Sequence, residues 1–379
     1  MITPATIYFS STIIPLKDGG GGSVVIYRHL KRLQKEGHHI VFLNCSPNHG
    51  VRTEFTQINI QKRWWHPPLR KYTPLLSTFR FWLHYRFLKN RLTFQKGDKI
   101  LGILEDTGSL LAQIIASQTK LPYYLFFHDD NIFSKYFEGH LFSLGNLKNI
   151  IHHCKHFFVV SKPMQELLKQ NCGENAIVIY PIPEGSSRKK GLAKVNFKGL
   201  QLCYAGTILP FHDQLIKKIF KAAQSMNGQL TLVTNSDLSI ANRFRDCEGI
   251  KIRRPLEKLH DLFTVLLEEM DVLLIFYSFN LAEEIRATHS FPSKLTEFCH
   301  LGIPILIIAP EESAIGLWAK EHKWQCYVNN DSMDEISEMI SRLQFPDFWE
   351  KCSRQSIQLA ENEFNPANIH QQLSLILNE

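Results

Sequence analysis

One strand–helix–strand stretch near the N-terminus decides the fold. Residues 6–44 have the sequence TIYFSSTIIPLKDGGGGSVVIYRHLKRLQKEGHHIVFLN. Thr6–Ser10 and His39–Asn44 are short runs rich in β-branched and aromatic residues, and Val24–Glu36 between them carries apolar residues at helical spacing. Because strands joined through a helix run parallel, this stretch predicts a parallel sheet covered by helices.

The alternation of strands and helices continues along the chain in two series. The further strands expected in the first half are Lys99–Leu104, Tyr123–Phe127, Phe157–Val160 and Ile177–Tyr180. In the second half they are Leu200–Ala205, Gln229–Val233, Ile250–Arg253, Val272–Phe276, Ile305–Ile308 and Cys326–Val328. Each series is long enough for its own sheet, and 379 residues favour two domains over one. We therefore expect an α/β protein with two Rossmann-like domains.

The domain limits follow from where this pattern is interrupted. Residues 184–199 are rich in Gly, Ser and Lys and lack an apolar helical stripe, which predicts a linker. The expected domains are residues 1–183 and residues 200–345. The tail, residues 346–379, is expected to be helical with one break near Asn365 and Pro366.

Positive charge is concentrated in one stretch of the chain. The formal net charge is +7, from 43 basic and 36 acidic residues, yet no acidic residue occurs between Glu54 and Asp98. Nine of the basic residues lie there, so the remaining 34 are slightly outnumbered by the acids. The nine are Lys62, Arg63, Arg70, Lys71, Arg80, Arg86, Lys89, Arg91 and Lys96. The basic character of the protein is therefore local.

The same stretch is rich in aromatic residues, which leaves three interpretations open. Trp64 and Trp65 stand among bases, as at the surface of anionic membranes, where indoles sit at headgroup depth. We therefore expect an acceptor-binding or membrane-binding patch that consists of Lys62, Arg63, Trp64, Trp65, Arg70 and Lys71. An ordinary core beneath solvated charges is the second interpretation. Binding of single-stranded nucleic acid is the third and least favoured, since the sequence contains no recognised nucleic-acid motif.

Several protein classes are excluded or disfavoured. No apolar run approaches the roughly 18 residues of a membrane span, and the start of the chain lacks the features of a secretory signal. The eight cysteines are spread singly, which suits reduced thiols better than disulfides or a zinc site. We expect a cytoplasmic protein that is peripheral on the inner face of the membrane.

A glycine loop precedes the first long helix. Asp18–Ser23 contains four consecutive glycines, which let backbone N–H groups approach a phosphate closely. Gly21 and Gly22 are the candidates for this contact. The loop matches neither Gly-x-Gly-x-x-Gly nor a P-loop, and a flexible turn without a ligand is the alternative.

A second candidate site is the stretch HSFPSKLTE at residues 289–297. Pro292 suits the first position of a helix, where its missing N–H costs nothing. The N–H groups that would then face an anion belong to Ser293, Lys294 and Leu295. Lys294 adds a full charge, and Glu297 is placed one turn further to accept hydrogen bonds from sugar hydroxyls. This arrangement predicts a site for a diphosphate and a ribose at the carboxyl edge of a sheet, and a capped helix with solvated side chains is the alternative.

Taken in order along the chain, these features resemble the two-domain nucleotide-sugar glycosyltransferases of the GT-B fold, and family 4 most of all. The matching features are the glycine loop, Gly37-His38 after its helix, the strand ending at His128, Val159-Val160-Ser161, Met270-Asp271, and Pro-Ser-Lys-Leu-x-Glu at 292–297 before Gly-x-Pro at 302–304. The resemblance implies two domains facing across a cleft, with the donor between the glycine loop and Ser293–Glu297. It also implies that the C-terminal helix returns to the first domain.

The chain departs from the family pattern at three places. His289 stands where family 4 usually has the first glutamate of Glu-x7-Glu, and His-x7-Glu resembles the donor motif of inverting plant-type enzymes of this fold. Thr207 and His212 replace an expected Arg and Lys, and the hinge Ile179–Pro183 lacks the usual Asn-Gly. The full set of expected donor-binding residues is Gly21, Gly22, Thr207, His289, Ser293, Lys294, Leu295 and Glu297.

A histidine and a carboxylate follow an aromatic strand and are the catalytic candidates. His128 and Asp129 come directly after Tyr123–Phe127, where similar enzymes have a histidine lining the cleft. An imidazole can hydrogen-bond a sugar hydroxyl or relay a proton. A structural role for His128, a helix-capping role for Asp130 and a metal site formed by the carboxylate pair are the alternatives. Enzymes of this fold normally neutralise the diphosphate without a metal, so we expect no metal.

These observations predict a glycosyltransferase that moves a monosaccharide from a nucleotide-diphosphate sugar to a glycan or lipid-linked acceptor, in envelope or surface polysaccharide synthesis. Retention of configuration is favoured by the family resemblance, and the departing phosphate can then take the acceptor proton. The nucleotide sugar is a substrate, so no cofactor is expected. The alternatives are a nucleotide-sugar 2-epimerase of the same fold and a non-catalytic glycan-binding or membrane-binding relative.

Overall fold

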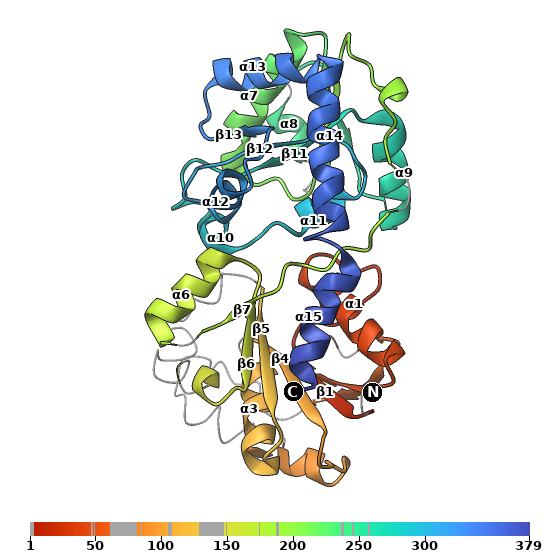
Figure 1. Cartoon of the computed structure of the whole chain (residues 1–379), viewed down its shortest axis with the longest axis vertical. Helices are drawn as coiled ribbons and strands as arrows, with labels where there is room; N and C mark the ends of the chain where they lie inside the picture. The colour runs from red at the N-terminus through yellow and green to blue at the C-terminus, as the bar shows by residue number, and fades with distance from the viewer. Residues whose placement is uncertain are drawn as a thin grey trace. The chain divides into compact units, whose positions relative to one another are not determined.

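The chain forms two compact units. The computed structural model, drawn in Figure 1, describes residues 4–46, 48, 50–60, 82, 83, 85–104, 108–128, 148, 150–173, 175–186, 189–235, 239–244, 246–256 and 258–379. Unit 1 comprises Met1–Tyr180 and Ile369–Glu379, and unit 2 comprises Pro181–Asn368.

Unit 1 is built on a parallel sheet. Among its described residues seven strands pair in the order β3-β2-β1-β4-β5-β6-β7. They are β1 (Thr6–Ser11), β2 (His39–Asn44), β3 (Thr56–Asn59), β4 (Lys99–Ile103), β5 (Tyr123–Phe127), β6 (His156–Val159) and β7 (Ile177–Val178). The helices are α1 (Gly22–Lys35), α3 (Gly108–Thr119), α6 (Lys162–Cys172) and α15 (Pro366–Leu377), of which the residues from Ile369 onward belong to this unit.

Unit 2 contains a second parallel sheet. In the part of this unit that the structure describes, six strands pair in the order β10-β9-β8-β11-β12-β13. They are β8 (Gln201–Ala205), β9 (Gln229–Val233), β10 (Ile250–Arg253), β11 (Val272–Phe276), β12 (Ile305–Ile308) and β13 (Tyr327–Val328). The helices are α7 (Asp213–Gln224), α8 (Ser239–Arg243), α9 (Leu259–Glu269), α10 (Ile285–His289), α11 (Ser293–Cys299), α12 (Ala314–Glu321), α13 (Met333–Leu343) and α14 (Pro346–Glu361), with a 3-10 turn at Pro210–His212.

The strands are hydrophobic because both faces of each sheet are covered. Every residue of β5, β11 and β12 is buried, as expected for central strands of a parallel sheet. The α/β fold with two parallel-sheet domains is therefore confirmed. Strand β3 was not predicted, because Thr56–Asn59 lacks a continuous β-branched or aromatic run and its residues are at most half-buried.

The segments at the predicted domain limits belong to the two units as follows. The expected linker, residues 184–199, belongs to unit 2, where the buried side chains of Lys190 and Asp271 form an ion pair of 3.4 Å. Helix α14 also belongs to unit 2, whereas α15 returns to unit 1. There the Ser374 hydroxyl of α15 donates a 2.7 Å hydrogen bond to Glu36 at the end of α1. None of the helices described in the structure is long and apolar enough to cross a membrane.

Candidate active site

The strand order of unit 2 predicts a ligand-binding crevice at the carboxyl ends of β8 and β11. Strand β8 begins the unit, β9 and β10 extend the sheet on one side of it, and β11 to β13 extend it on the other. The chain after β8 and the chain after β11 therefore leave the sheet in different directions. Open parallel sheets bind their ligands at such a switch point.

Lys294 brings a positive charge to this crevice. Its Nζ lies 4.5 Å from the centre of the Tyr204 ring and 3.4 Å from the Tyr204 hydroxyl. No acidic side chain of the described residues lies within ion-pairing distance of this Nζ. Burial lowers the pKa of Lys294 to about 8, and the negative charge of Glu284 partly opposes that shift. Such an ammonium on an aromatic ring is available to bind an anion.

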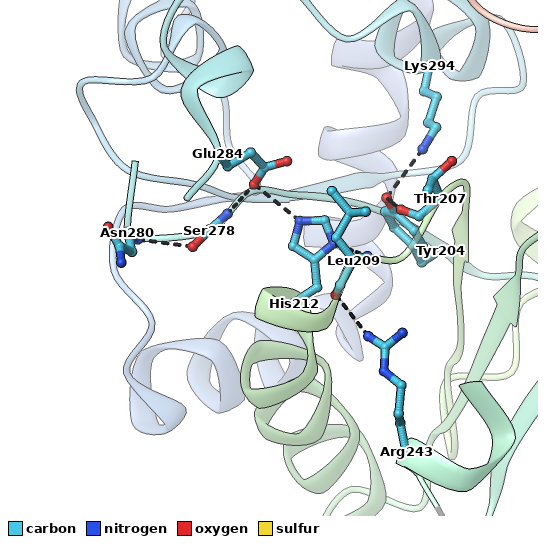
Figure 2. A network of polar contacts seen from close by, with 9 residues as sticks. All are labelled: Tyr204, Thr207, Leu209, His212, Arg243, Ser278, Asn280, Glu284 and Lys294. Atoms are coloured by element: carbon cyan, nitrogen blue, oxygen red, sulfur yellow. Dashed lines mark hydrogen bonds and ion pairs between the residues drawn. The ribbon is translucent and has the colours of Figure 1, made fainter. Parts of the chain in front are cut away.

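Gly206 makes room for this ammonium. A Cβ atom at position 206 would lie only 1.7 Å from the Nζ of Lys294. The Gly206 N–H donates a 2.8 Å hydrogen bond to the Val233 carbonyl, so the sheet fixes its backbone. The Tyr204 hydroxyl donates a 2.9 Å hydrogen bond to the carbonyl of Thr207, whose side chain is exposed. The predicted residues Thr207 and Lys294 thus lie beside the same tyrosine (Figure 2).

A buried histidine and a glutamate join the two loops that border the crevice. The Leu209 N–H donates to Nδ1 of His212 at 3.2 Å, which leaves the ring proton on Nε2. This Nε2 donates to Oε2 of Glu284 at 3.2 Å, and the Ser278 N–H donates to the same oxygen at 2.7 Å. Figure 2 shows Glu284 and Lys294 on opposite sides of the space around Leu209 and Thr207. Glu284 was not among the predicted site residues.

Arg243 stabilises the turn at Leu209 and His212. Its guanidinium donates a 2.9 Å hydrogen bond to the Leu209 carbonyl and forms a bidentate ion pair with Asp213. The turn that carries His212 is therefore held by hydrogen bonds to its backbone at Leu209 and to the imidazole ring of His212. The sequence identifies His212 only as the replacement of a lysine, because nothing in the local pattern links it to Glu284 or Arg243.

Helix α11 is positioned slightly differently from the prediction. Pro292 is the N-cap of the helix and Ser293 its first residue, so the helix starts one residue later than expected. The Leu295 N–H donates to the Pro292 carbonyl at 3.0 Å, and the Leu295 side chain is buried in the core. This backbone hydrogen bond corrects the expectation that the Leu295 N–H is open to an anion.

The other two predicted residues near α11 have different surroundings. Oε2 of Glu297 accepts a 3.1 Å hydrogen bond from the Glu184 N–H, so this buried carboxylate fastens the chain entering unit 2. A role of Glu297 toward sugar hydroxyls stays a prediction. His289 is the last residue of α10 and is half-buried.

The glycine loop of unit 1 is closed by Ser23. The Ser23 hydroxyl donates to the Ile14 carbonyl at 2.5 Å and accepts from the Leu16 N–H at 3.3 Å. Gly21 is the N-cap of α1 with φ 53° and ψ −127°, a conformation that side chains strongly disfavour. A Cβ at Gly21 would meet no atom within 4 Å, so only backbone conformation and not crowding requires glycine there. Gly22 begins α1.

His128 lies at the carboxyl end of β5 and stacks on Phe126, with 5.3 Å between ring centres. Its Nε2 is buried and has no hydrogen-bond partner among the described residues. Burial lowers the pKa of His128 to about 4, so the ring is neutral at physiological pH.

Several predicted residues lie outside the described ranges. Asp129 and the patch residues Lys62, Arg63, Trp64, Trp65, Arg70 and Lys71 are among them. In the part of the chain that the structure does describe, no three His, Cys, Asp or Glu side chains are grouped so that they could hold a metal ion.

Comparison with known proteins identifies chains of the same fold. The model of glycosyltransferase family 4 matches residues 19–185. HepE from Anabaena, solved with UDP and glucose, is similar over 100% of both chains, with a TM-score of 0.67 and 12% identity. Residues 19–185 thus match glycosyltransferase family 4, and the whole chain has the GT-B fold. No protein of curated function matches its sequence.

Two further solved structures have the same fold as this chain. WaaG, a glycosyltransferase involved in lipopolysaccharide biosynthesis, is similar over 98% of this chain and 99% of its own, with a TM-score of 0.59 and 12% identity. MurG from Acinetobacter baumannii is similar over 99% of both chains, with a TM-score of 0.56 and 12% identity.

Proposed function

We propose that this protein is a glycosyltransferase that moves a monosaccharide from a nucleotide-diphosphate sugar, held at Lys294, to a glycan or lipid-linked acceptor of the cell envelope or surface. The single observation that carries the proposal is the Lys294 ammonium, which lies on Tyr204 at the switch point of unit 2 and forms no ion pair with any described carboxylate. The UDP bound by the similar protein HepE and the role of WaaG in lipopolysaccharide biosynthesis agree with it.

The chemistry required of Lys294 is stabilisation of the leaving diphosphate. Negative charge develops on the bridging oxygen as the sugar–phosphate bond breaks, and an ammonium positioned in advance stabilises that charge most where water is excluded. A pKa of about 8 keeps most of the Lys294 side chains protonated at neutral pH. With this charge in place, transfer needs neither a metal nor a cofactor, and in a retaining reaction the departing phosphate takes the acceptor proton.

In unit 1, the glycine loop and His128 are the candidate groups for binding substrates. The loop at Gly21 and Gly22 offers backbone N–H groups to a phosphate. Because its pKa is about 4, His128 acts as a neutral hydrogen-bonding group at Nε2. It is therefore suited to orient an acceptor hydroxyl.

An exposed aromatic and basic helix face supports peripheral binding to an anionic membrane. The side chains of Trp82, Leu83 and Phe87 are 36%, 41% and 38% exposed. The Arg86 guanidinium lies 5.0 Å from the Trp82 ring, and that of Arg91 lies 4.0 Å from the Phe87 ring. Such pairs place apolar groups and positive charge together, as interfacial helices do. Flotation with anionic liposomes should be lost when both arginines become glutamate and unchanged for Lys320→Glu.

Calorimetry with UDP and GDP, followed by a nucleotide-release assay with a panel of nucleotide sugars, tests the proposal. We expect the wild type to bind one of the two nucleotides. Lys294→Met should bind it about 10- to 100-fold more weakly, because that is the affinity lost with one charged hydrogen bond. Lys320→Met is the matched control, since Lys320 is exposed and paired with Glu311 on the surface. Lack of nucleotide binding by the folded wild type would favour a non-catalytic relative, and conversion of the donor without an acceptor would favour an epimerase.

A further inference from the structure

We propose that Glu284 binds hydroxyl groups of the donor's sugar and thereby selects neutral sugars over sugars that carry a carboxylate. This inference rests on the proposed function, because it concerns the part of the nucleotide sugar beyond the diphosphate. Neither the sequence motifs nor the family pattern pointed to this residue.

The two oxygens of the Glu284 carboxylate have different surroundings. Oε2 accepts two hydrogen bonds, from the Ser278 N–H at 2.7 Å and from His212 Nε2 at 3.2 Å. Oε1 has no hydrogen-bond partner among the described residues. These two hydrogen bonds fix the direction of the carboxylate. Because the side chain is 11% exposed, solvent still reaches it. One oxygen therefore anchors the group, and the other is available to a ligand.

Glu284 and Lys294 border the same crevice without neutralising each other. Their charged atoms are beyond ion-pairing distance, yet the charge of Glu284 still raises the pKa of Lys294 against the effect of burial. In Figure 2 the Glu284 carboxylate and the Lys294 ammonium face the space above Leu209 and Thr207 from opposite sides. A ligand in this space therefore meets positive charge at one end and negative charge at the other.

A nucleotide-diphosphate sugar has the matching distribution of groups. Its diphosphate requires a cation, which Lys294 supplies, and its sugar presents hydroxyl donors. A carboxylate accepts strong hydrogen bonds from hydroxyls, because its charge strengthens them. The same carboxylate repels a sugar with an acid group of its own, such as a uronic acid. A fixed negative charge thus both binds and discriminates.

His212 is the positioning residue for Glu284. Its own ring is oriented by the Leu209 N–H, and its Nε2 proton points at Oε2 of the glutamate. The rings of Phe211 and Phe276 contact the His212 ring edge-on and further fix its plane. Loss of this imidazole would free the carboxylate to rotate, without removing any contact to the diphosphate.

Calorimetry with matched ligands separates the sugar contact from the diphosphate contact. The probes are UDP, UDP-glucose and UDP-glucuronic acid, or GDP and GDP-mannose if GDP is the nucleotide bound. For Glu284→Gln we expect affinity for the free nucleotide to change less than twofold and affinity for the neutral nucleotide sugar to fall about 10- to 100-fold. Preference for UDP-glucose over UDP-glucuronic acid should fall by a similar factor. Unchanged nucleotide binding also demonstrates that the variant is folded.

Two further variants complete the test. Glu283→Gln, at the exposed neighbouring carboxylate, should behave as wild type with every probe. His212→Asn should weaken binding of the neutral nucleotide sugar but not of the nucleotide, and it should have no further effect in the Glu284→Gln background. Equal nucleotide-sugar affinity in Glu284→Gln and wild type would overturn the inference alone. Lack of nucleotide binding by the wild type would overturn the proposed function as well.

Discussion

Gly206→Ala is predicted to impair nucleotide binding by moving a lysine that it does not replace. The new Cβ would lie 1.7 Å from Nζ and 2.7 Å from Cε of Lys294. Ordinary contact between such atoms is about 3.5 Å, so the ammonium must withdraw by about 2 Å. The backbone at position 206 cannot move aside easily, because its N–H is bonded to Val233 in the neighbouring strand.

The expected magnitude follows from what this displacement removes. An ammonium displaced by about 2 Å loses a charged hydrogen bond to the diphosphate, worth about 1.5–3 kcal/mol, or about 10- to 100-fold in affinity. Folding should suffer as well, because the φ of Gly206 is +158°, a backbone conformation that residues with a side chain rarely adopt. We expect the free energy of unfolding to fall by about 1–3 kcal/mol, and a denaturant titration shows whether the variant is folded under the conditions of the binding assay.

Calorimetric titration with the nucleotide is the assay, and Gly191→Ala is the matched control. A Cβ at position 191 would meet no atom within 4 Å, and Gly191 lies in the same unit as Gly206. The double variant Gly206→Ala with Lys294→Ala should bind no more weakly than Lys294→Ala alone, because both changes act on the same ammonium. Nucleotide affinity in Gly206→Ala equal to that of Gly191→Ala would show that the Lys294 ammonium does not bind the diphosphate from this position.

Three further results are expected. Because the pKa of Lys294 is about 8, its charge is lost as pH rises, and the nucleotide affinity of the wild type should fall about tenfold between pH 7 and pH 9. The affinity of Lys294→Met should not change over this range, and a flat profile in the wild type would contradict the prediction. Because Gly21 has a positive φ, Gly21→Ala should lower the free energy of unfolding by about 1–3 kcal/mol in a denaturant titration, whereas Gly20→Ala should not. Equal effects of the two substitutions would exclude backbone strain at Gly21. The ring of His128 should titrate near pH 4 by NMR, and a midpoint near its ordinary value would exclude its burial.

The strands of this protein were predictable because parallel sheets have a strong local signature. Tyr123–Phe127 and Val272–Phe276 were placed at their observed limits, since strands buried on both faces are short unbroken apolar runs. Thr56–Asn59 was missed because it pairs only with β2, at the edge of the sheet, and is defined by that pairing rather than by its own composition.

The candidate site was predictable only where one segment carried its chemistry. Lys294 was found because it follows Pro292 at a helix start, although the helix begins one residue later than expected. Glu284 was missed because its role depends on His212, which is 72 residues away in sequence and on a different loop. Contacts of this kind arise from the order of strands in the sheet, which no local pattern encodes.

The structure of the protein with its bound nucleotide shows directly whether Lys294 holds the diphosphate. We predict that a diphosphate oxygen lies within hydrogen-bonding distance of Nζ of Lys294, above Gly206 at the carboxyl end of β8. A nucleotide bound elsewhere on the molecule, with Lys294 still resting on Tyr204, would exclude Lys294 as the residue that binds the diphosphate.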